Sequence, residues 1–98
     1  MKIILGNPGS GKTKKIIQMS SENNIPILCE SEARRERLLV KAMGYGFSIP
    51  TPIVYTDCDD SVNEVYVDDV EKLLQTMFKI NVNCITINVT DKNNVEKI

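Results

Sequence analysis

The chain has 98 residues, of which 42% are hydrophobic and 26% are charged, and its formal net charge is -1. These proportions are typical of one small globular domain and exclude a disordered tail. The near-zero charge argues against a surface built to bind nucleic acid, and we expect neither a membrane span nor a signal peptide because no apolar run is long enough.

Cysteine and histidine usage restricts the chemistry that the chain can perform. There are three cysteines, without a Cys-x-x-Cys pair, and no histidine. We therefore expect no zinc site and no disulfide framework, but free thiols in a reducing cytoplasm. Any catalysis has to depend on carboxylates, lysine, arginine, hydroxyl groups and a bound ion.

Helix and strand patterns alternate along the chain, which predicts an α/β fold with a mainly parallel sheet. The predicted strands are Lys2–Leu5, Ile27–Cys29, Val65–Val67 and Asn83–Val89, with a short extra strand at Ile53–Thr56. The predicted helices are Lys12–Glu22, Glu32–Met43 and Val70–Phe78, and a polar tail follows the last strand. Right-handed crossovers place helices on both faces of a four-stranded sheet, which gives three layers in a single domain of residues 1–98.

The segment between the first strand and the first helix has the sequence of a phosphate-binding loop. It matches the pattern G-x-x-x-x-G-K-[ST] at every fixed position, as Gly6-Asn7-Pro8-Gly9-Ser10-Gly11-Lys12-Thr13. Such a loop surrounds a triphosphate with backbone N–H groups at the positive end of a helix. Lys12 is expected to reach the β- and γ-phosphates and the Thr13 hydroxyl to bind Mg²⁺. The alternative is a glycine-rich turn that only joins strand to helix, and it is disfavoured because a chance match to the whole pattern is rare.

Two carboxylates, Asp68 and Asp69, follow the third predicted strand. They stand at the edge of the sheet where the carboxyl ends of parallel strands face a ligand. Asp68 is predicted to hold a water molecule on Mg²⁺, and Asp69 to orient the water that attacks the γ-phosphate. The alternative is that one of the two caps the helix that follows.

Together the motifs Gly6–Thr13 and Val65–Asp69 resemble those of the P-loop NTPases, in the branch that includes RecA-like and helicase-like ATPases. The whole chain is also similar to small P-loop proteins of bacteriophages. The resemblance implies bound ATP and Mg²⁺, and a strand order 2-3-4-1 in which Asn83–Val89 lies between the two motif strands. It implies a sensor of the γ-phosphate at Asn88 or Thr90. It further implies a magnesium-dependent ATPase in the host cytoplasm, with phage DNA metabolism as the candidate process.

The sequence departs from this family in three respects. Hydrolases of the family keep a Glu where this chain has Asp69, which is one methylene shorter, so we expect slow or absent hydrolysis. The sheet is expected to be truncated after its fourth strand, without a second lobe or a lid. No arginine follows Arg37, so we expect a protein partner or a second copy of the chain to supply one. The alternative function is a non-catalytic module in which bound nucleotide stabilises a partner-binding surface, while the missing lid disfavours a small phosphotransferase.

An arginine-rich stretch opens the second predicted helix, for which Ser31 is the expected N-cap. Arg34 and Arg35 stand at the same edge of the sheet as the phosphate-binding loop, and they are candidate contacts for a ligand or a nucleic-acid strand. The alternative is that their aliphatic stems pack on the protein while the charged heads stay in water.

Overall fold

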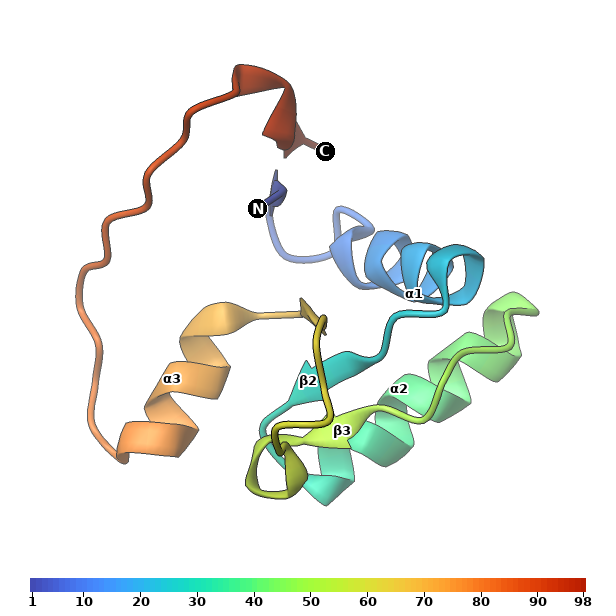
Figure 1. Cartoon of the computed structure of the whole chain (residues 1–98). Helices are drawn as coiled ribbons and strands as arrows, with labels where there is room; N and C mark the ends of the chain where they lie inside the picture. Colours follow the sequence, from blue (N-terminus) through green and yellow to red (C-terminus); the bar gives the residue numbers. More distant parts are fainter.

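Ten short elements follow one another along the chain in the computed structural model, which describes all 98 residues (Figure 1). The helices are α1 (Lys12–Asn23), α2 (Glu32–Tyr45) and α3 (Val70–Phe78), with 3-10 turns η1 (Tyr55–Asp57) and η2 (Lys92–Asn94). The strands are β1 (Ile3–Leu5), β2 (Ile27–Cys29), β3 (Ile53–Val54), β4 (Tyr66–Val67) and β5 (Val95–Lys97). The alternation confirms the α/β class that the sequence predicts.

The strands form two small parallel sheets rather than one continuous sheet. In the first sheet β2 lies between β3 and β4, with Leu28 opposite both Ile53 and Val67. In the second sheet β1 pairs with β5, with Ile3 opposite Val95. The predicted pairing of the second and third strands is therefore confirmed as β2 beside β4, whereas the order 2-3-4-1 of a single sheet is not seen.

The core lies between the three-stranded sheet and two helices. α1 and α2 contact each other, and both contact β2. The most deeply buried side chains in this layer are Ile17, Ile27 and Leu38, each exposed by 1% or less. In Figure 1, α3 lies on the opposite side of the strands from α1, so helices flank the strands on both sides. This arrangement brings the start of α1, the start of α2 and the end of β4 to one edge of the fold.

The helices begin where the sequence predicts, because their starts are determined locally. Ser31 caps α2 and accepts a hydrogen bond from the backbone N–H of Arg34, which confirms the expected N-cap. α2 ends two residues later than predicted, at Tyr45, because Gly46 has a left-handed conformation (φ 81°) that closes the helix.

The prediction of a strand at Asn83–Val89 is wrong for this structure. Residues 82–89 form no strand and make no backbone–backbone hydrogen bond, and a strand exists only where such bonds pair it with a neighbour. Figure 1 shows the segment as an extended stretch on the outside of the molecule. Its alternating apolar side chains, Ile85, Ile87 and Val89, are each more than 40% exposed.

The polar tail contains structure that the sequence did not predict. Residues 95–97 form β5, which pairs with β1, and the N–H of Ile98 donates to the carbonyl of Leu5 at 2.8 Å. Glu96 also lies 3.4 Å from Lys2 and 3.7 Å from Lys15. The tail therefore occupies one edge of β1, next to the phosphate-binding loop.

Candidate functional site

The loop of residues 6–11 has a left-handed backbone at two of its glycines. Gly9 has φ 79° and Gly11 has φ 96°, values that residues other than glycine rarely adopt. The N–H of Ser10 donates to the carbonyl of Asn7 at 3.0 Å and closes the turn between them. α1 then begins at Lys12 without a side-chain cap, so its first N–H groups are free to bind an anion.

Gly6 is required for a different reason, which is lack of space. A Cβ atom at this position would overlap the hydroxyl oxygen of Ser10 and stand 2.7 Å from the carbonyl oxygen of Ile98. The first fixed glycine of the motif thus lets the loop pass close to the end of β5.

The side chain of Lys12 folds back into the loop that precedes it. Its ammonium group donates to the carbonyls of Gly6 at 2.7 Å and Asn7 at 2.8 Å, and it lies 3.5 Å from the hydroxyl of Ser10. The positive charge is therefore held inside the concave side of the loop, where the pattern predicts phosphate oxygens.

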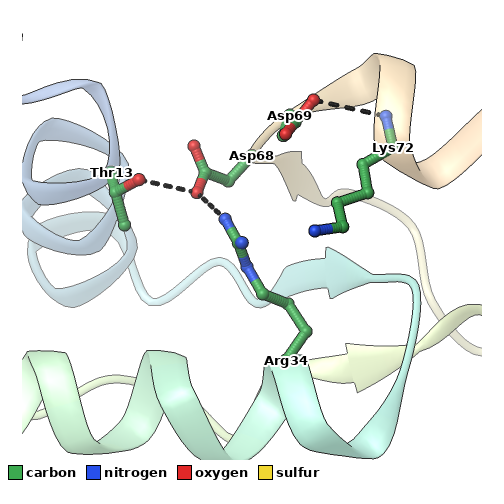
Figure 2. Close-up of polar contacts among 5 residues, drawn as sticks. All are labelled: Thr13, Arg34, Asp68, Asp69 and Lys72. Carbon is green, nitrogen blue, oxygen red and sulfur yellow. Dashed lines mark hydrogen bonds and ion pairs between the residues drawn. The ribbon is translucent and has the colours of Figure 1, made fainter. Parts of the chain in front are cut away.

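Asp68 joins the loop to the end of β4. Its Oδ2 accepts a hydrogen bond from the Thr13 hydroxyl at 2.9 Å and a charge-assisted bond from Arg34 Nη2 at 2.5 Å (Figure 2). The carboxylate is buried, with its side chain 7% exposed, and the Arg34 side chain is 15% exposed. The structure thus brings together three of the predicted residues, from α1, α2 and the end of β4.

Asp69 points away from this cluster and caps α3. Figure 2 shows its carboxylate turned toward Lys72, and Oδ1 accepts from the Lys72 backbone N–H at 3.2 Å. The residue has a left-handed backbone (φ 62°), which Asp tolerates better than most residues. The capping alternative is therefore seen for Asp69, while its predicted role in catalysis stays a prediction.

Two other predicted residues lie outside the cluster. Arg35 pairs with Glu32 of its own helix at 3.8 Å, and its side chain is 27% exposed. Asn88 lies in the exposed segment 82–89 and makes no hydrogen bond with the loop or with Asp68. Both lie outside the cluster around Asp68, and their ligand and sensor roles stay predictions.

Glu30 is a buried carboxylate that the sequence analysis did not assign to the site. It follows β2, at the same edge of the sheet as Asp68, and is 6% exposed. Its Oε1 has no hydrogen-bond partner. An acidic residue directly after a buried strand was the signal that could have identified it.

The donors present fit a magnesium ion that takes most of its ligands from phosphate and water. Thr13 and Asp68 offer a hydroxyl and a carboxylate 2.9 Å apart, but no group of three or more acidic or cysteine side chains is close enough to enclose a metal alone. Mg²⁺ is commonly bound in this way, through one or two protein oxygens and substrate phosphates.

A cleft of about 830 Å³ separates β1 from β4, the two strands that carry the motifs. Its lining is mostly apolar and includes Ile3, Leu5, Val65, Val67 and Ile87. β1 pairs only with β5 and β4 pairs only with β2, so each strand has an edge without a partner.

Comparison with protein-family models, with characterised proteins and with solved structures finds no match to the chain. No helix combines the length and the apolar character needed to cross a membrane.

Proposed function

We propose that residues 6–13 of the chain bind a nucleoside triphosphate and that the chain hydrolyses it slowly. The nucleotide we propose is Mg-ATP. One observation carries this proposal. The hydrogen bond from Thr13 to Asp68 joins the phosphate-binding loop to the acidic strand end across 55 residues of sequence. The two motifs lie far apart in the sequence, and a shared ligand would explain why their polar ends meet.

In this proposal each residue of the cluster has a separate task. Backbone N–H groups of the loop and of the start of α1 bind the phosphates, and Lys12 exchanges its carbonyl partners for β- and γ-phosphate oxygens. Thr13 and Asp68 would hold Mg²⁺, which would neutralise charge on the phosphates. Asp69 orients a water molecule whose oxygen forms a bond to the γ-phosphorus while the bond from phosphorus to the bridging oxygen breaks. The products are ADP and inorganic phosphate, and the proton that the water loses passes to solvent. Because Asp69 already caps α3, we expect this step to be slow.

The same proposal includes the P-loop NTPase fold, with segment 83–89 as a strand between β1 and β4. The cleft between these strands supports it, because two unpaired strand edges face an apolar space. The alternation of Ile85, Ile87 and Val89 suits a strand, and these side chains are exposed where they now lie. Docking of the segment would bury them and satisfy its backbone groups.

The open cleft also favours a second function, in which nucleotide stabilises the fold without turnover. The two sheets share no backbone pairing, and the contact of Thr13 with Asp68 joins the end of β4 to the start of α1, which follows β1 and the phosphate-binding loop. A ligand that bridges the loop and Asp68 would hold the sheets together and raise stability by mass action. A partner protein or a second copy would then recognise the nucleotide-loaded form.

Calorimetric titration with a non-hydrolysable Mg-ATP analogue tests the binding proposal. We compare the unaltered chain with Lys12→Ala and with a matched control, Lys14→Ala, because Lys14 is an exposed lysine of the same helix. Binding that Lys12→Ala abolishes and Lys14→Ala retains supports the proposal. Equal binding by all three, or none, overturns it.

Phosphate release then separates the two functions. Release of phosphate from Mg-ATP, measured with and without double-stranded DNA, supports the ATPase, and stimulation by DNA supports a role on nucleic acid. Binding with a higher melting temperature and no release supports the stabilised module.

A further inference from the structure

We propose that Arg34 is the residue by which the chain distinguishes a nucleoside triphosphate from a diphosphate. In the free protein its guanidinium group is held on Asp68, and in the loaded protein it binds the terminal phosphate. This inference rests on the proposed nucleotide binding and deepens it, because it assigns to this chain the arginine that the sequence analysis expected from a partner.

The buried carboxylate of Asp68 is paired with Arg34. A carboxylate this deeply buried needs a counter-charge, and Arg34 is the only cation that pairs with it. The contact is a single short bond to Oδ2 from Nη2. The Nε and Nη1 atoms of Arg34 make no hydrogen bond, so most of the guanidinium donors are unused.

The Arg34 bond and the Thr13 bond end on the same atom, Asp68 Oδ2, so the guanidinium and the hydroxyl are near neighbours. Figure 2 shows Arg34 reaching this oxygen from α2 while Thr13 reaches it from α1. Thr13 directly follows Lys12, and the motif places Lys12 at the β- and γ-phosphates and the Thr13 hydroxyl on Mg²⁺. The free donors of Arg34 therefore stand beside the end of the triphosphate.

A dication held by Thr13 and Asp68 supplies the positive charge that Arg34 supplies in its absence. The guanidinium is then available to the nearest anion, and its planar fork matches two phosphate oxygens. ADP has no γ-phosphate, so a contact between Arg34 and the γ-phosphate raises the affinity for ATP more than the affinity for ADP.

Calorimetry with two probes tests the inference: the β,γ-imido analogue of ATP, and ADP, each with Mg²⁺. We compare the unaltered chain with Arg34→Gln, Arg34→Lys and a control, Arg37→Gln, which alters an exposed arginine of the same helix. Loss of a charge-assisted contact lowers affinity about tenfold or more. We expect Arg34→Gln to lose this factor for the ATP analogue and to retain its affinity for ADP, and Arg37→Gln to change neither.

Circular dichroism confirms that each variant is folded. If Arg34→Gln does not fold, Arg34→Lys tests the inference instead, because lysine keeps a positive charge for Asp68 but lacks the planar guanidinium fork. We expect Arg34→Lys to lose part of the preference for the ATP analogue over ADP. Equal losses for both nucleotides, or no loss for either, overturn the inference and leave Arg34 as the counter-ion of Asp68 alone. A chain that binds neither nucleotide, with Lys12→Ala no different, overturns the proposed function together with it.

Discussion

Thr13 and Asp68 are 55 positions apart in the sequence, yet the Thr13 hydroxyl donates a hydrogen bond of 2.9 Å to Asp68 Oδ2. The bond links the start of α1 to the end of β4 and is partly buried. It is therefore a structural contact of the free chain as well as the centre of the proposed ligand site.

Replacing Thr13 tests both roles of this contact. Thr13→Ala removes a donor from a buried carboxylate and should lower the free energy of unfolding by about 1–3 kcal/mol. It should also remove the dependence of nucleotide binding on Mg²⁺. Thr13→Ser keeps the hydroxyl and should retain most of both properties. Urea denaturation and calorimetry with and without EDTA measure them, and an Ala variant that still requires Mg²⁺ would contradict the assignment.

Replacing Asp69 separates its observed role as a cap from its predicted role in catalysis. Asp69→Ala removes the helix cap, which should lower the free energy of unfolding by about 1 kcal/mol. It also places in the left-handed region a residue that has a Cβ and no compensating polar group, which should lower it by about 1 kcal/mol more. Asp69→Asn retains the capping oxygen and tolerates this conformation, so its stability should change by only a few tenths of a kcal/mol.

The Asn variant therefore isolates the chemistry of the carboxylate. If Asp69 orients the attacking water, Asp69→Asn binds Mg-ATP normally and releases no phosphate. Unchanged phosphate release would show that the residue acts only as a helix cap.

Gly6 should not tolerate even a methyl group. The added Cβ of Gly6→Ala meets Ser10 and the backbone of Ile98, which is itself bonded to Leu5. We expect a loss of about 1–3 kcal/mol in stability and weaker nucleotide binding, because the loop or β5 has to shift. Gly44→Ala is the matched control, since a Cβ there enters open space within α2 and should stabilise the helix by roughly 0.5–1 kcal/mol. Equal effects of the two substitutions on melting temperature would contradict this account.

Cys29 should resist alkylation at neutral pH while the other two cysteines react. Burial, together with the negative charge of Glu30, raises the pKa of the Cys29 thiol above its ordinary value of 9.0, so the reactive thiolate is scarce. Cys58 and Cys84 are exposed and serve as internal controls. Peptide mass spectrometry after treatment with N-ethylmaleimide measures all three, and labelling of Cys29 as fast as Cys58 would contradict the burial.

The same shift gives a direction for stability at high pH. The unfolded chain loses the Cys29 proton near pH 9.0, before the folded chain does. The unfolded state then binds fewer protons, so this group lowers stability as the pH rises through that value. Glu30→Gln should bring the pKa of the Cys29 thiol closer to its ordinary value, because the substitution removes the negative charge of Glu30.

The features that the sequence predicted correctly depend on short-range rules. The helical spacing of Leu73, Leu74 and Met77 and the N-cap at Ser31 act within a few residues, so the corresponding helices begin as expected. Gly9 and Gly11 of the loop act in the same way, because glycine itself favours the left-handed backbone at these two positions.

The features that the sequence did not predict depend on distant partners. Residues 95–97 contain one apolar side chain, and β5 forms only because β1 offers an edge more than 90 residues away. Segment 83–89 has the alternation of a strand, but no neighbour pairs with it in this structure. The meeting of Arg34 with Asp68 depends on how α2 packs on β2 and β3, which the sequence could indicate only as a shared edge.

The folded-back side chain of Lys12 has a consequence for the thermodynamics of binding. A free lysine side chain carries rotational entropy worth about 2 kcal/mol, and ordering it usually opposes ligand binding. In this loop Gly6 and Asn7 already restrain the ammonium group. The entropy of the Lys12 side chain is therefore lost when the chain folds and not when an anion binds. The ordering of this side chain should contribute little to the entropy of association.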